Sequence, residues 1–126
     1  MVTRLTVRRW APPFLVATAI FVGSVAPAPS DMGGLGPRFL LSLDKVVHFV
    51  GYALLGGTLA AAMEESPPSR GTLALALVAL VAVYGAGLEV LQSLLPTRGF
   101  SVGDVLANVL GGMLGVWLVL RRRRED

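Results

Sequence analysis

The chain has 126 residues, of which 54% are hydrophobic and only 15% are charged. Soluble domains carry about 25% charged residues. This composition, together with a mean hydropathy of +0.70, therefore excludes an ordinary soluble domain and indicates a membrane protein. The net charge of +3 does not indicate nucleic-acid binding, because most arginines lie near the two ends of the chain. The absence of cysteine excludes disulfides and thiolate chemistry.

The apolar residues fall into four blocks of about the length that a membrane-spanning helix needs, roughly 20 residues. We therefore predict an all-α integral membrane protein, a four-transmembrane-helix bundle that forms one domain over residues 1–126. The expected helices cover about residues 12–28, 44–63, 72–95 and 101–120.

The first expected helix follows a basic segment that ends at Trp10, and Pro12 and Pro13 suit its first turn. The basic segment, the short apolar run and the small residues at 26–28 also match a cleavable signal peptide. Because Pro29 would directly follow that cleavage site and hinder cutting, we expect the segment to remain as a helix.

Each later helix has a signal at one of its ends. Ser42 or Asp44 is expected to cap the second helix, because a side-chain oxygen there accepts from free N–H groups of the first turn. The segment before it is expected to form a loop or a short interfacial stretch. Pro96 ends the third helix. Ser101 and Asp104 have the spacing of a capping box at the start of the fourth.

The orientation follows from the basic residues, since cytoplasmic ends of membrane helices carry an excess of lysine and arginine. Both ends of this chain are rich in arginine, and an even number of spans places both ends on one side. We therefore predict that both termini are cytoplasmic and that the hairpin at residues 96–100 faces outward.

With this topology, the polar residues of the spanning segments gather at the outer end of three helices. Ionisable residues inside a membrane mark functional sites by default. Residues three or four apart share a helix face, and glycines let helices approach closely, so these stripes are expected to face the interior. The three stripes are Asp44, His48 and Tyr52; Gly85, Glu89 and Gln92; and Asp104, Asn108, Gly111 or Gly112, and Gly115.

The motifs that carry these residues follow a recognisable order. They are Asp-Lys-x-x-His-Phe-x-x-Tyr at 44–52, Gly-x-Glu-x-x-Gln at 87–92, Pro-x-Arg at 96–98 and Ser-x-x-Asp-x-x-x-Asn-x-x-Gly at 101–111. Over about residues 40–120 this series resembles the VanZ family of small bacterial membrane proteins, named for an accessory protein of teicoplanin resistance. The resemblance implies a multi-pass protein of the bacterial plasma membrane with a cell-envelope role, and it implies no particular activity.

As an enzyme site, the cluster offers an acid/base pair beside cations that suit an anion such as phosphate. The expected partners are membrane lipids, with a lipid-linked cell-wall precursor or another anionic headgroup at the outer leaflet as ligand, and no nucleic acid. The candidate catalytic residues are Glu89, His48 and Asp104, and the candidate ligand-binding residues are Asp44, Lys45, Gln92, Arg98 and Asn108.

Two other interpretations use the same side chains. As a metal site, Asp44, His48, Glu89 and Asp104 offer oxygen and nitrogen ligands, but a single histidine without an established ligand signature favours no metal and no cofactor. As a structural set, these groups join helices, Asp44 and Asp104 cap helix starts, and Arg98 pairs with a carboxylate of the outer hairpin. The sequence leaves open whether the protein is an enzyme or a non-catalytic assembly or stabilising factor.

Overall fold

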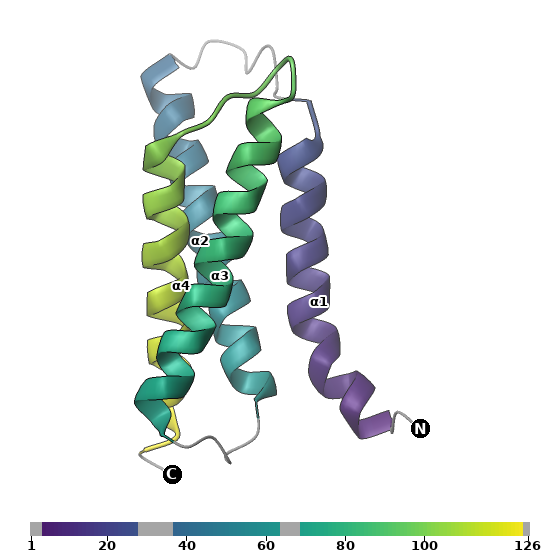
Figure 1. The fold of residues 1–126 in the computed structure, drawn as a ribbon, viewed down its shortest axis with the longest axis vertical. Coiled ribbons are helices and arrows are strands. Elements are labelled where there is room, and N and C mark those ends of the chain that lie inside the picture. Colours follow the sequence, from purple (N-terminus) through teal and green to yellow (C-terminus); the bar gives the residue numbers. More distant parts are fainter. Residues whose placement is uncertain (1–3, 28–36, 64–68, 125–126) are drawn as a thin grey trace.

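The computed structural model describes residues 4–27, 37–63 and 69–124. Within these ranges the chain is helical, as predicted, with four helices: α1 Arg4–Val25, α2 Pro37–Ala62, α3 Arg70–Ser93 and α4 Val102–Arg122. Successive helices run in opposite directions (Figure 1). We call the end of the bundle where residues 94–101 join α3 to α4 the hairpin end, and the opposite end, where α1 begins and α4 ends, the terminal end.

Three of these helices are long and apolar enough to cross a membrane, over Leu43–Ala62, Arg70–Ser93 and Val102–Arg122. By length and composition the chain is therefore a multi-pass membrane protein. Helix α1 is not in this set, because basic residues in its first turns and two prolines reduce its apolar character. A fourth span through α1 stays a prediction.

Helix α1 begins at Arg4 rather than near residue 12, so Pro12 and Pro13 lie inside the helix and not in its first turn. The prediction for this start is wrong, because residues 4–11 include arginine, leucine and alanine, which favour helix. A proline inside a helix removes a backbone hydrogen bond and bends the axis. Figure 1 shows α1 turning away from the bundle in its N-terminal part.

Helix α2 begins at Pro37, earlier than residue 44. The expectation that Ser42 or Asp44 caps this helix is therefore wrong, because both positions lie inside it. Proline suits the first helical position, since its fixed φ is helical and its missing N–H would have no partner there. Residues 37–43 of the loop expected at 29–43 are therefore helical, and its residues 29–36 lie outside the described residues.

Helices α2 and α4 make the closest contact in the bundle, and glycines make it possible. A Cβ atom at Gly56 would lie 2.6 Å from the carbonyl oxygen of Gly112, and Cβ atoms at Gly111 and Gly115 would overlap carbonyl oxygens of α2. Small residues let membrane helices approach to backbone contact. The prediction that the glycine stripe of the fourth helix faces the interior is confirmed.

The apolar core lies between these two helices and α3, and α1 packs on its side. Tyr84 of α3 binds α1 directly, because its hydroxyl donates to the carbonyl oxygen of Ala17 over 2.7 Å. The core therefore fixes the rotation of each helix and sets which polar side chains meet at the hairpin end. Two clusters of buried apolar residues form this core: Ala60, Leu73, Leu77, Val116 and Leu120 in one, and Tyr52, Leu55 and Val81 in the other.

Candidate functional site

The polar stripes of α2, α3 and α4 meet at the hairpin end, and most of their side chains are enclosed by the helices. Glu89 and Asn108 are each only 1% exposed, and Gln92 and Asp104 are also buried. Burying such groups is costly unless they are paired, so their partners decide what the cluster does.

His48 lies at the centre of the cluster. Its Nδ1 is 2.8 Å from Oδ1 of Asn108, and because an amide oxygen only accepts, Nδ1 carries the proton in the neutral ring. The other ring nitrogen, Nε2, then keeps its lone pair and lies 3.8 Å from Oδ1 of Asp44. The ring is nearly parallel to that of Tyr52, at a centroid distance of 6.3 Å. In this tautomer Nε2 is the ring nitrogen that keeps a lone pair.

Glu89 joins α3 to the start of α4. Its Oε2 accepts a hydrogen bond from the backbone N–H of Ser101 over 3.1 Å, and its Oε1 lies 3.9 Å from Nδ1 of His48. The Ser101 hydroxyl in turn accepts from the N–H of Asp104 over 3.2 Å, as a helix cap does. Half of the predicted capping box is therefore confirmed. In the other half, the N–H of Ser101 donates to Glu89 and not to Asp104.

Asp104 pairs with Lys45 of α2 instead. The Lys45 ammonium lies 3.1 Å from Oδ1 of Asp104. A Cβ atom at Gly103 would lie 2.6 Å from Cε of Lys45, so this glycine leaves space for the lysine stem. The Lys45 side chain is still 44% exposed, so this ion pair is only partly buried.

Two buried atoms of the cluster have no hydrogen-bond partner within the described residues, Oε1 of Glu89 and Nδ2 of Asn108. A Cβ atom at Gly85 would lie 2.9 Å from this amide nitrogen and 3.0 Å from Cε1 of Tyr52, so only glycine fits between them. Buried polar atoms in native proteins are nearly always paired. A cluster that served only to join helices would be expected to use both atoms.

Arg98 and Gln92 bind the end of α1. Arg98 donates from Nε and Nη2 to the carbonyl oxygen of Ala26, over 3.3 and 3.1 Å, and from Nη2 to that of Gly23 over 3.2 Å. Gln92 donates to the carbonyl oxygen of Ser24 over 3.3 Å. The last carbonyls of a helix lack partners within it, so these side chains cap α1. Within the described residues, no carboxylate forms an ion pair with Arg98.

A cavity of about 390 Å³ opens beside this cluster, between α1, α2 and α3. Four of the eight predicted site residues line this cavity, and the other four do not. Its polar lining includes these four, Asp44, His48, Gln92 and Arg98, and its apolar lining includes Val16, Ala19, Ile20, Val47 and Leu54. The remaining predicted residues, which join α2, α3 and α4 outside this lining, are Lys45, Glu89, Asp104 and Asn108.

Three of the four residues of the alternative metal site come together. Asp44, His48 and Asp104 each place a ligand atom within 4.8 Å of the others, whereas Glu89 is not part of this group. Oxygen and imidazole ligands suit several divalent cations. The Lys45 ammonium already lies on Asp104, however, and supplies a positive charge at the same carboxylate.

The sequence did not predict the contacts that hold α1 to α3. Tyr84 had a usable signal, because a hydroxyl in the middle of an apolar helix needs an acceptor. The carbonyl oxygens of Ser24 and Ala26 had none, because every residue carries one. Only the packed structure identifies these carbonyls as acceptors for Gln92 and Arg98.

One comparison with known proteins identifies a family for this chain. The family model described as VanZ/LLP1 matches residues 6–123, which include every polar residue of the cluster. No curated protein and no solved structure matches the chain. Because the family match covers almost the whole sequence, the chain belongs to the VanZ/LLP1 family.

Proposed function

We propose that this protein binds a phosphate-bearing lipid, a lipid-linked cell-wall precursor or another anionic headgroup, at the outer leaflet of the bacterial plasma membrane and serves the cell envelope. The cavity beside the polar cluster carries this proposal, because it combines polar side chains at the hairpin end with apolar walls from α1 and α2. Ligand sites commonly pair an apolar lining with a few polar groups that orient the ligand. Such a lining suits an amphiphile with a charged head.

The proposal includes four spans with both termini in the cytoplasm. The arginines of the terminal end support this orientation through the positive-inside rule. Arg98 and Tyr84 bind α1 to the rest of the bundle, which supports a span for α1 beside the other three. The hairpin end then lies at the outer surface, where an extracytoplasmic headgroup would reach it.

Arg98 is the proposed anchor for the anion. Its Nε and Nη2 hold the end of α1, and its Nη1 is the proposed donor to a phosphate oxygen. His48 also lines the cavity, and its Nε2 is the proposed second polar contact. A protonated His48 would donate to the phosphate, and a neutral one would accept a proton from the ligand.

If the protein is an enzyme, His48 is its proposed acid/base group. Asn108 holds the ring through Nδ1, and Nε2 would then be the nitrogen that exchanges a proton with the ligand. Glu89, 3.9 Å from Nδ1, would stabilise the positive charge that His48 gains on accepting a proton. The geometry therefore supports acid/base chemistry only with a ligand seated at Nε2, and binding is the simpler function.

The alternative is a non-catalytic assembly or stabilising membrane protein whose polar cluster only holds the helices together. The contacts of Gln92 and Arg98 with the end of α1 favour it, and so does the cap that Glu89 provides for α4. Under this alternative the cavity has no ligand, and filling it would leave function unchanged.

The test fills the cavity from its apolar wall. The variant Ile20→Trp places a large ring in the lining and leaves every polar group intact. Val22→Trp is the matched control, because Val22 lies on the same helix, is 56% exposed and does not line the cavity. Binding of a polyprenyl phosphate to the purified protein in nanodiscs is measured for both variants and the parent.

We expect the parent and Val22→Trp to bind the polyprenyl phosphate equally, and Ile20→Trp to bind it at least tenfold more weakly, a difference of about 1.4 kcal/mol. Equal binding by Ile20→Trp, or no binding by the parent, would contradict the proposal and favour the assembly alternative.

A further inference from the structure

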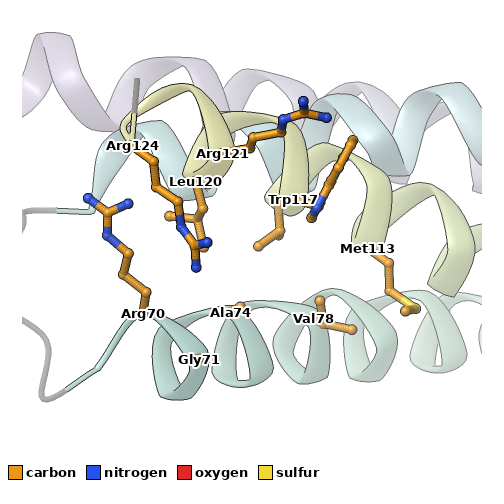
Figure 2. Close-up of a pocket in the computed structure, with 10 residues that line it drawn as sticks. Arg70, Gly71, Ala74, Val78, Met113, Trp117, Leu120, Arg121 and Arg124 are labelled. Atoms are coloured by element: carbon orange, nitrogen blue, oxygen red, sulfur yellow. The ribbon is translucent and has the colours of Figure 1, made fainter. Parts of the chain in front are cut away.

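A second cavity, of about 580 Å³, lies between α3 and α4 at the terminal end, far along the bundle from the polar cluster. Figure 2 shows Arg70 and Arg124 at one end of this groove and Val78 and Met113 at the other. The apolar lining between them includes Ala74, Trp117 and Leu120. The groove is therefore basic at its mouth and apolar along its length.

The basic mouth is built by contacts between the two helices. Arg70 donates from Nη2 to the carbonyl oxygen of Arg123 over 3.1 Å, which holds its guanidinium beside the end of α4. Arg121, also in the lining, places its guanidinium carbon 5.1 Å from the centre of the Trp117 ring. Guanidinium groups bind phosphate with two parallel hydrogen bonds, and basic pockets between membrane helices suit anionic lipid headgroups.

The length of the groove matches one leaflet. From Met113 to Arg122, where α4 ends, the helix rises about 14 Å. Half of a hydrocarbon core of about 30 Å is about 15 Å. The groove thus runs from the headgroup level at the arginines to about the middle of the membrane, the depth of one acyl chain.

We propose that this groove binds one anionic phospholipid, with its phosphate between Arg70 and Arg124 and one acyl chain along Ala74, Val78 and Trp117. Charge complementarity selects the anionic lipid, and the apolar lining selects its chain. This site is independent of the proposed function, because the two cavities share no lining residue.

The test uses the fluorescence of Trp117, which lines the groove. The chain has two tryptophans, so the variant Trp10→Phe reports on Trp117 alone. This protein is reconstituted in two kinds of phosphatidylcholine vesicle. One contains phosphatidylglycerol with brominated acyl chains, and the other contains the same mole fraction of phosphatidylcholine with brominated acyl chains. We expect brominated phosphatidylglycerol to quench Trp117 more strongly, because bromine atoms in the groove lie beside the ring.

Variants of the Trp10→Phe protein identify the groups responsible. Arg70→Gln and Arg124→Gln should each lower the preference for the anionic lipid about fivefold, since one arginine near an anionic lipid contributes about that factor. Arg122→Gln is the matched control, because it removes the same charge from the same run of arginines but does not line the groove. Ala74→Phe fills the groove without changing its charge and should reduce quenching by the anionic lipid.

Three results would overturn the proposal. Equal quenching by the two brominated lipids would show that the groove does not select charge. An equal loss of preference in Arg122→Gln and Arg124→Gln would show general attraction to the surface instead of a site. No quenching by either lipid would show that no acyl chain lies beside Trp117, as expected if a second copy of the chain covers the groove.

Discussion

The substitution Glu89→Gln separates a functional site from a structural one, because it removes a buried charge and keeps the shape of the side chain. Glu89 accepts one hydrogen bond from the N–H of Ser101 over 3.1 Å, and the amide oxygen of glutamine can accept the same bond. Glutamine loses only the extra strength that the carboxylate charge gives to this hydrogen bond, about 1 kcal/mol. Burying a charged carboxylate is itself costly, so the removal of its charge offsets some of this loss. We expect the free energy of unfolding to fall by no more than about 1 kcal/mol.

Function should respond more strongly if the carboxylate supports a ligand or a protonated His48. We then expect Glu89→Gln to accumulate normally in the membrane, while binding of a phosphate-bearing lipid falls about tenfold or more, or about 1.4 kcal/mol, and the envelope phenotype is lost. Unfolding in mixed micelles, membrane abundance and lipid binding are measured on the same preparations. Glu89→Leu is the companion variant: it leaves the Ser101 N–H unpaired and should cost about 1 to 3 kcal/mol of stability.

Full lipid binding and phenotype in Glu89→Gln, at normal abundance, would refute this reasoning and leave the structural role. A Glu89→Leu protein as stable as the parent would refute the cap on α4. Arg98→Lys is the weaker test of function. Arg98 makes three hydrogen bonds to carbonyls of α1, and loss of two of them at about 0.6 kcal/mol each already costs about 1 kcal/mol of stability.

Three further predictions follow from the packing, the cap and the topology. Gly115→Ala should destabilise the protein strongly, because its Cβ would overlap the backbone of α2, whereas Gly87→Ala has open space and should stabilise α3 by up to about 1 kcal/mol; both are measured by unfolding in mixed micelles. Ser101→Ala should cost about 1 kcal/mol by the same measurement, since it removes the cap of α4. In intact cells an impermeant thiol reagent should label Gly99→Cys and not Ser66→Cys, and the reverse pattern would invert the proposed orientation.

The class of the protein and the composition of its polar cluster could be predicted from the sequence, because both depend on short-range properties. Hydropathy over about 20 residues identifies spans, and spacing of three or four residues identifies a helix face. On this basis Gly85, Glu89 and Gln92 were predicted to face the interior, and all three are buried. The resemblance to the VanZ family rested on motifs that include Glu89 and Gln92, and the family match confirms it.

Helix starts were predicted less well, because several residues near each start carry competing signals. Ser42 and Asp44 are good caps, but Pro37 is equally suited to a first helical position, and α2 begins there. Pro12 and Pro13 suggested that the first helix starts near residue 12. It starts at Arg4, because the residues before the prolines also favour helix.

The tertiary structure alone decided which polar groups meet. Glu89 binds the backbone of a residue 12 positions away, Lys45 pairs with Asp104 across 59 positions, and Arg98 caps α1 through Ala26 across 72. Each pairing depends on the rotation and depth of whole helices, and these are set where glycines bring α2 and α4 into backbone contact. A sequence specifies the face on which a side chain lies, but the partner on the next helix follows only from how the faces pack.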